Sequence, residues 1–126
     1  MTNHAANEIE NEIQAKGLTA PRVTPQQIND AVTSEHYFTA LEGEMYATGN
    51  LDGAEYRVKN HQALGLLTFC VLVLKNGFTV TGESACASPE NFDAELGRKI
   101  ARQNAVNKIW PLEGYLLKSK LNEVAP

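Results

Sequence analysis

The chain has 126 residues, the size of one domain, and its 43% hydrophobic and 21% charged residues are typical of a globular fold. The formal net charge of -4 argues against a broad nucleic-acid-binding surface. The longest apolar run, 66–74, is far shorter than the roughly 20 residues of a membrane helix. The acidic, polar start does not resemble a signal peptide, so we expect a cytosolic protein.

A first helix is predicted over residues 3–16, where Ile9 and Ile13 lie on one side and Gly17 provides a natural stop. This apolar stripe is thin, so the helix is marginal alone and favours packing on a partner.

A second helix is predicted over residues 25–34, with Thr24 as N-cap and Pro25 at the first helical position. Gln27, three residues after Thr24, completes a capping box. We therefore expect residues 1–34 to form a helical segment used in oligomer contacts.

The middle of the chain carries weaker signals. Residues 36–40 are compatible with a short strand, and residues 41–60 contain several turn residues. The stretch 55–58 alternates weakly, and either a loop or a short strand is consistent with it.

A β-hairpin is the clearest local prediction. The apolar strand 66–74 and the return strand 78–84 flank Asn76-Gly77, the preferred dipeptide of a two-residue type I′ turn. With that turn, Val73 would pair with Val80 and Phe69 with Ser84.

A long helix is predicted over about 89–110, with Ser88 as its N-cap and Pro89 at its first position. Residues spaced by four mark the expected buried face, namely Phe92, Leu96 and Ile100. Pro111 should kink or break this helix, and a second segment should follow, with an apolar side formed by Leu112, Leu116, Leu117 and Leu121.

These elements predict a single domain over residues 1–126 of the α/β (α+β) class. A small antiparallel sheet with a central hairpin, about 66–84, would be packed by the long helix and by shorter N-terminal helices.

Catalytic and metal sites find little support in the residues. Cys86 precedes a helix start, where its pKa would fall, and either His36 or His61 would be the base, yet no local signature accompanies it. Glu83, near a strand end, could orient a ribose hydroxyl, pair with an arginine or be a solvated acid. The histidines and cysteines have no metal-ligand spacing, so we expect no metal site.

An anion site is more plausible at the start of the long helix. Free N–H groups there favour anions, and hydroxyl and amide donors come from Ser84, Ser88 and Asn91. Phe78, just after a tight turn, could stack on a base or belong to the core.

The cations of the chain have two interpretations. Arg98 and Arg102 could serve a site in the middle of the helix, completed by a second subunit, because they lie too far along the helix to reach its own N-terminus. They could equally be a solvated face paired with Glu95. Arg22 lies in an extended segment and could be an ordinary surface arginine.

The chain contains the block NGFTVTGESACASPENFDAELGRKIARQNAVNKIWPLEGYLL and the earlier stretch KGLTAPRVTPQQI. Together these resemble phage-encoded Thoeris anti-defence proteins of the first kind. The resemblance implies a non-catalytic sponge in the cytoplasm of the infected bacterial host, which sequesters cyclic ADP-ribose isomers intact. It also implies homodimers, hexamers built as a trimer of dimers in some members, and cyclic trinucleotide binding in a separate pocket of some members.

The resemblance further implies roles for individual residues. Phe78 would stack on the adenine, and the loop with Ser84, Ser88 and Asn91 would bind phosphate or ribose. Arg98 or Arg102 would neutralise the pyrophosphate. Arg57 is a further candidate ligand residue, and Arg22 with Thr24 would serve the second nucleotide pocket.

Two other functions stay open at this stage. One is a small enzyme that degrades a nucleotide signal through Cys86 or Glu83. The other is a phage module that binds and blocks a host protein through its apolar helix faces. No cofactor, nucleic-acid polymer or membrane is expected as a partner.

Overall fold

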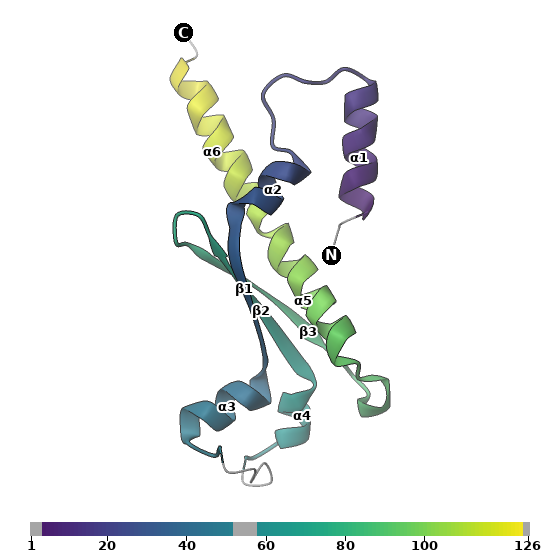
Figure 1. Cartoon of the computed structure of the whole chain (residues 1–126), viewed down its shortest axis with the longest axis vertical. Helices are drawn as coiled ribbons and strands as arrows, with labels where there is room; N and C mark the ends of the chain where they lie inside the picture. Colours follow the sequence, from purple (N-terminus) through teal and green to yellow (C-terminus); the bar gives the residue numbers. More distant parts are fainter. Residues whose placement is uncertain (1–3, 52–57, 125–126) are drawn as a thin grey trace.

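The computed structural model describes residues 4–51 and 58–124. Its centre is an antiparallel sheet of three strands in the order β1-β2-β3, with β1 Val32–Thr39, β2 Leu67–Leu74 and β3 Thr79–Ala85. Helix α5, Ala94–Asn107, lies along one face of this sheet (Figure 1). The predicted α+β class is therefore confirmed. The other helices are α1 His4–Ala15, α2 Pro25–Ala31, α3 Ala40–Thr48, α4 His61–Gly65, the 3-10 turn η2 Pro89–Asn91, and α6 Ile109–Val124.

The core lies between the sheet and α5. Alternate residues of β2 are buried on the α5 side, namely Thr68, Cys70, Leu72 and Leu74. Gly82 of β3 lets the helix come very close, because a Cβ there would lie 2.1 Å from the Ala101 carbonyl oxygen. The helix and the strand are thus in direct backbone contact.

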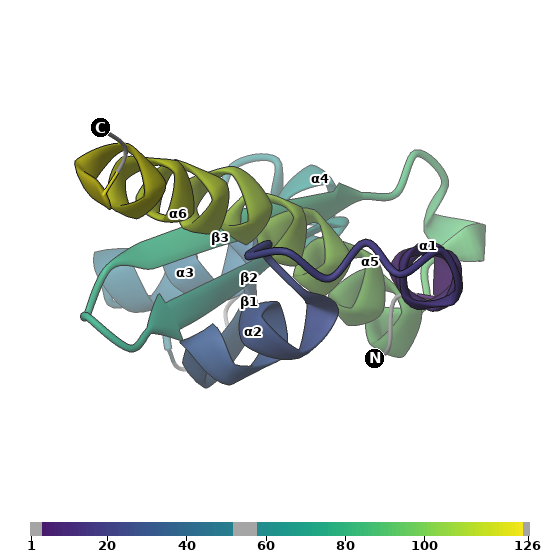
Figure 2. The same ribbon diagram turned by 90° about the horizontal axis from the view of Figure 1, so that it is seen from above.

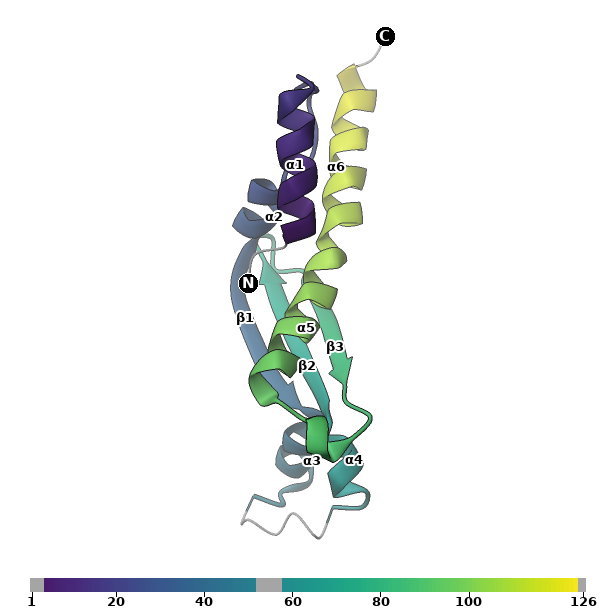
Figure 3. The same ribbon diagram turned by 90° about the vertical axis from the view of Figure 1, so that its right-hand side faces the viewer.

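The other face of the sheet is partly open. Phe69, Val71 and Val73 of β2 point to this face and are only half-buried. The Phe38 ring of β1 stacks beside Phe69, with ring centroids 5.6 Å apart. Figures 2 and 3 show α5 along the opposite side of the sheet.

The N-terminal helices differ from the prediction at one boundary. Thr24 caps α2 as expected, accepting the Gln27 N–H at 3.1 Å, but α2 ends at Ala31 and not at residue 34. Val32 instead begins β1, which runs through residue 39 and is longer than the predicted strand 36–40. Pairing with β2, including the Lys75 N–H to the Ala31 carbonyl, overrides the local helix signal.

Helix α1 stands away from the sheet and contacts mainly α2 (Figure 1). Its Glu10 carboxylate accepts two hydrogen bonds of 2.6 Å from the Arg22 guanidinium. Gly17, with φ of 68°, ends the helix as predicted.

Residues 41–48 belong to helix α3, where turns were expected, and α4 begins only at His61. α3 begins with a reciprocal capping box, in which Thr39 accepts the Glu42 N–H and Glu42 accepts the Thr39 N–H. Gly49, with φ of 76°, ends it. Of the undecided stretch 55–58, residues 55–57 lie outside the described residues, and Val58 is buried.

The predicted hairpin is present, but its turn has three residues and not two. The Leu74 N–H donates to the Phe78 carbonyl, and Gly77 has φ of 87°. The Asn76 side-chain oxygen accepts the Phe78 N–H at 2.9 Å. This N–H is therefore not available for the backbone hydrogen bond that would close a two-residue turn. The register moves by one residue, so Val73 pairs with Thr79 and Phe69 pairs with Glu83.

The start of the long helix lies later than predicted. Asp93 is the N-cap of α5 and accepts the Leu96 N–H at 3.0 Å, while Pro89–Asn91 forms a separate 3-10 turn. Ser88 is therefore not the cap of the long helix.

The predicted buried face of α5 is also wrong. Leu96 and Ile100 are 53% and 43% exposed, whereas Gly97, Ala101 and Ala105 face the sheet. Small residues occupy the contact because the helix lies so close to Gly82 that larger side chains would not fit between the two backbones.

The break before Pro111 is confirmed. α5 ends at Asn107, Lys108 forms a turn, and α6 begins at Ile109. α6 then continues past the end of the sheet (Figure 3). Among the residues that the structure describes, no helix has the length and apolar character needed to cross a membrane.

Candidate functional site

A charged cleft runs between the edge strand β1 and helix α5. The inward-pointing side chains of β1 are polar here, and they face a row of charged residues on α5. The cleft has a volume of about 310 Å³ and is lined by Glu35, Tyr37, Glu95, Arg98, Lys99 and Arg102. Arg98 and Arg102 are four residues apart and thus adjacent on the helix surface. A volume of this size is at the lower end of the about 300–1,000 Å³ of small-molecule sites.

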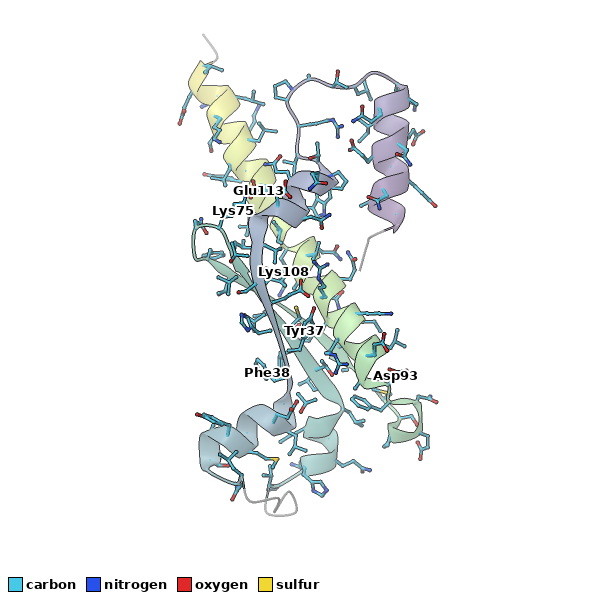
Figure 4. The ribbon with its side chains drawn as sticks, in the orientation of Figure 1. Tyr37, Phe38, Lys75, Asp93, Lys108 and Glu113 are labelled. Atoms are coloured by element: carbon cyan, nitrogen blue, oxygen red, sulfur yellow. The ribbon has the colours of Figure 1, made fainter. Side chains whose placement is uncertain are left out.

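One hydrogen-bond network crosses the cleft. The Arg102 Nε–H donates to Glu35 Oε2 at 3.0 Å, and the Tyr37 hydroxyl donates to Glu35 Oε1 at 2.7 Å. Tyr37 pairs in register with the buried Cys70 of β2, so the two side chains lie on the same face of the sheet. Figure 4 shows Tyr37 on the α5 side of β1 and Phe38 on the opposite side.

The pKa values of three groups in and below the cleft are shifted, namely those of Tyr37, Glu35 and Cys70. Burial, together with the Glu35 carboxylate, raises the pKa of Tyr37, so this hydroxyl stays protonated as a donor. Burial tends to raise the pKa of Glu35, but the hydrogen bonds from Tyr37 and Arg102 outweigh it and the pKa is lowered. Burial raises the pKa of Cys70. The cleft thus holds a stable carboxylate beside fixed cations.

The cleft continues toward the start of α5 as a smaller hollow of about 130 Å³. Tyr37 and Arg98 line both parts, and Thr39, Thr68 and Phe92 extend the lining. Thr68 is 3% exposed, and its hydroxyl has no hydrogen-bond partner among the described residues. Phe38, Ala94 and the Glu42 carboxylate complete the lining of this hollow, so cations, hydroxyls, carboxylates and aromatic rings all lie along β1 and α5.

This arrangement suits an anionic ligand that also carries hydroxyl groups. Guanidinium groups bind phosphate oxygens with two parallel hydrogen bonds, and Lys99 adds a point charge. The carboxylate of Glu35 has lone pairs beyond the two already used, because a carboxylate offers about four acceptor positions.

Arg98 and Arg102 are thus together in one cleft. Because α5 starts at Ala94, Arg98 lies about one turn from the helix start and also lines the hollow there, so the prediction that it lies too far along the helix to reach that end is wrong. Arg102 is not simply a solvated surface residue, since its side chain is 16% exposed and bound to Glu35.

Phe78 lies elsewhere, in an apolar groove between the hairpin and α6. This groove has a volume of about 470 Å³ and is lined mainly by Ala31, Leu74, Phe78, Leu112, Tyr115 and Leu116, with Lys75, Asn76 and Glu113 at its border. Figure 4 shows Lys75 and Glu113 at this end of the molecule, and Tyr37 farther down the sheet. Within one chain, β2 lies between Phe78, which directly precedes β3, and the cleft beside β1.

Two of the predicted polar loop residues, Ser84 and Asn91, line a third hollow of about 130 Å³, beside Cys86 and Leu96. Ser88 does not line it; its hydroxyl donates to the Glu90 carboxylate. The first turn of α5 is capped by the Asp93 carboxylate, so the predicted anion cradle already holds a negative group. This loop and the two arginines lie in separate hollows.

The residues proposed for a second nucleotide pocket have partners within the chain. Arg22 binds Glu10 through both of its terminal nitrogens, and the Thr24 hydroxyl caps α2. Arg57 lies outside the described residues.

The candidate enzyme groups are not gathered at the cleft. The Cys86 thiol donates to the Ser88 carbonyl at 3.1 Å, and Glu83 pairs with Phe69 on the open side of the sheet. Within the described ranges, no group of three His, Cys, Asp or Glu residues could hold a metal ion.

Sequence reasoning missed Glu35 and Tyr37, the residues on the strand side of the cleft. The stretch VTSEHYFT is rich in β-branched and aromatic residues, which is a strand signal over 32–39. Period-two alternation along that strand would have placed both residues on one face.

The comparisons with known proteins identify one family. A family model described as "Phage protein (N4 Gp49/phage Sf6 gene 66) family" matches residues 23–121. No curated protein and no solved structure matches the chain. Because the match covers most of the chain, the chain belongs to this phage protein family.

Proposed function

We propose that this member of the phage protein (N4 Gp49/phage Sf6 gene 66) family binds a cyclic ADP-ribose-type signal and holds it intact in the cytoplasm of the infected host. The observation that carries the proposal is the convergence of Arg98, Lys99 and Arg102 opposite Glu35 and Tyr37 in one cleft. The resemblance to Thoeris anti-defence proteins supplies the class of ligand.

Each part of the ligand has a counterpart in the cleft. The pyrophosphate would lie against Arg98 and Arg102, where charge-assisted hydrogen bonds are strongest. Ribose hydroxyls would lie at the strand side, near Tyr37. The adenine would extend toward Phe92 at the start of α5, because an aromatic face is the usual platform for a base.

A role for Phe78 in the same site requires a second copy. Phe78 is 57% exposed at the hairpin, and neighbouring Tyr115 is 76% exposed, so both rings are available to a partner. We propose a homodimer that uses this groove, with Phe78 of one copy turned toward the ligand of the other. Binding of cyclic trinucleotides near Arg22 and Thr24, in a hexamer, is a further part of the proposal and would require Arg22 to leave Glu10.

The test is depletion and recovery of ligand. Purified protein is mixed with a panel of cyclic ADP-ribose isomers and cyclic di- and trinucleotides, and free ligand is measured by chromatography before and after the protein is boiled. We expect one isomer to disappear and to return unchanged. A new product would instead indicate an enzyme, and no depletion would favour a protein that blocks a host factor.

The Arg98→Ala and Arg102→Ala variants locate the site. Each removes a charge-assisted contact of about 1.5–3 kcal/mol, so ligand affinity should fall by at least about tenfold. Lys108→Ala is the matched control, because Lys108 is an exposed cation in the turn after α5 and does not line the cleft. Equal affinity of all three variants would place the ligand elsewhere.

A further inference from the structure

Glu35 is an unusual residue for its position. It points to the α5 side of the sheet, pairs in register with the buried Leu72, and brings a negative charge into a cleft rich in cations. A carboxylate beside an anion-binding site weakens the binding of plain anions. Its presence there therefore needs a reason beyond charge balance.

The geometry shows what this carboxylate does in the free protein. One oxygen accepts from Arg102 and the other accepts from Tyr37, so the group is fixed between the helix and the strand. Its side chain is still 39% exposed. The remaining lone pairs of both oxygens can therefore accept hydrogen bonds from a ligand.

The net charge of the cleft also favours a ligand that carries hydroxyl groups in addition to phosphate. Three cations face two carboxylates, Glu35 and Glu95, so the lining has one net positive charge at neutral pH. Such a site attracts a compact polyanion only weakly, whereas it can satisfy a molecule that offers both phosphate oxygens and hydroxyl donors.

We propose that Glu35 is the specificity-determining residue of the cleft, accepting a ribose hydroxyl of the bound ligand and disfavouring anions that lack one. This inference rests on the proposed function, because it describes how the same cleft selects its ligand. The ligand class it names is a ribose joined to phosphate, and a bare phosphate or pyrophosphate is disfavoured by the negative charge of Glu35.

The experiment compares two probes on full-length wild type and Glu35→Gln. The probes are the cyclic ADP-ribose isomer that the wild type depletes and inorganic pyrophosphate, each followed by calorimetry. Glu35→Gln should lose about tenfold or more in affinity for the cyclic isomer, since a hydrogen bond to a charged acceptor is lost. It should gain affinity for pyrophosphate by a similar factor, because one repulsive charge is gone.

The affinities for the two probes are expected to change in opposite directions. This distinguishes a change of specificity from damage to the fold, because a distorted cleft would lose affinity for both probes. Glu44→Gln is the matched control, an exposed carboxylate on α3 that does not line the cleft. Unchanged selectivity in Glu35→Gln would overturn the inference while leaving the proposed function in place. Failure of the wild type to bind any cyclic isomer would instead overturn the proposed function.

A second measurement starts from the wild type alone and then adds Glu35→Gln. Wild-type protein is titrated with ribose 5-phosphate and with 2-deoxyribose 5-phosphate, which differ by one hydroxyl. The ribose form should bind more tightly, and Glu35→Gln should reduce that difference. Equal binding of the two sugars by the wild type, together with an unchanged preference in Glu35→Gln, would exclude a hydroxyl-reading role.

Discussion

The cleft lies beside α5 and the groove lies beside α6, the next helix of the chain. The side chains of the cleft already bind one another, whereas those of the groove are largely exposed. In the cleft, Glu35, Tyr37 and Arg102 already bind one another, and the cations lie on a helix fixed against the sheet. In the groove, Phe78 and Tyr115 are largely exposed and make an apolar surface at the end of the sheet.

The cleft and the groove differ in the kind of partner that each would suit. A small charged ligand needs donors and acceptors that are held in place before it arrives, which the cleft provides. An apolar surface with exposed aromatic rings suits a macromolecule, since aromatic residues are enriched in protein interfaces. The proposals above therefore place the nucleotide signal in the cleft and the second copy at the groove.

The largest effect should come from Gly82, where α5 lies directly against β3. In Gly82→Ala, the new Cβ would lie within 2.3 Å of the backbone of Ala101 and Ala105, so α5 must move off β3. We expect a loss of at least about 3 kcal/mol in the free energy of unfolding, measured by urea denaturation, and loss of ligand binding.

Gly43→Ala is the control for that substitution. A Cβ at Gly43 would meet the Phe38 ring at an ordinary 3.6 Å, and Gly43 is inside helix α3. Replacing a helical glycine by alanine should stabilise the chain by up to about 1 kcal/mol. Equal destabilisation by both substitutions would contradict the close packing of α5 on β3.

The next effect should be confined to the groove. Leu116→Glu puts a charge among its apolar side chains, so the proposed dimer should weaken by about thirtyfold or more in Kd, as for an interface hot spot of at least about 2 kcal/mol. Light scattering across a concentration series measures this. Lys118→Glu places the same carboxylate on α6 outside the groove and should leave the mass unchanged.

The variant Leu116→Glu also tests the link between the two regions. If Phe78 of a second copy completes the ligand site, ligand affinity must fall together with the dimer. A monomeric variant with wild-type ligand affinity would show that the cleft of one chain is sufficient.

A smaller effect on stability should come from the start of α5, near one end of the cleft. Asp93→Ala removes the cap of α5 at the end where the smaller hollow opens, and losing such a cap costs about 1 kcal/mol. Ser88→Ala, at the position where the sequence suggested a cap, should change stability by less than about 0.5 kcal/mol. Thermal unfolding of both variants measures the difference, and the reverse order would contradict the observed helix start.

The contrast between Asp93 and Ser88 shows where sequence reasoning failed. The Ser-Pro-Glu pattern does start a helical turn, but only the 3-10 turn Pro89–Asn91, and the chain then restarts at Asp93. Local pattern identified a helix start and could not decide which of two nearby acceptors would cap the long helix.

Long-range packing explains the other failures. Apolar spacing suggested that Leu96 and Ile100 would be buried, but the close approach at Gly82 turns the small residues Gly97 and Ala101 inward. Strand β1 was under-predicted at its start, where pairing with β2 overrides the helix signal of residues 25–34. Glu35 and Tyr37 were missed because the predicted strand began only at residue 36, although the alternation in VTSEHYFT places both on one face.

Other parts of the fold follow from local chemistry and were predicted. Asn76-Gly77 marks the hairpin, Thr24 caps α2, and Pro111 follows the break between α5 and α6. At the candidate site, helical spacing alone brought Arg98 and Arg102 together. The opposite wall of the cleft depends on tertiary structure.

The smallest effect should leave both regions intact and concern α1 alone. Hydrogen bonds from Arg22, and then from Gln14, lower the pKa of Glu10 from 4.5 to about 2. A lowered pKa in the folded state stabilises the pairing above pH 4.5, and the stabilisation is lost as the pH falls toward 2.

Limited proteolysis with pepsin across that range should therefore cut between α1 and α2 before the sheet is attacked. Glu10→Gln should show the same cleavage pattern at a higher pH, while Glu12→Gln, in an exposed pair with Lys16, should not. Resistance of the wild type at the lowest pH would contradict the anchoring role of Arg22.

The two thiols of the chain differ sharply in accessibility. Cys70 is fully buried beneath the Tyr37 hydroxyl, and burial raises its pKa, so reagents that need a thiolate reach it only when the sheet separates from α5. Cys86 is half-buried in the loop before α5. Mass spectrometry can follow each thiol separately after brief alkylation. The rate at which Cys70 is alkylated in the native chain therefore reports how often the core opens. A ligand that closes the cleft over Tyr37 would lower this rate at Cys70, without any added label.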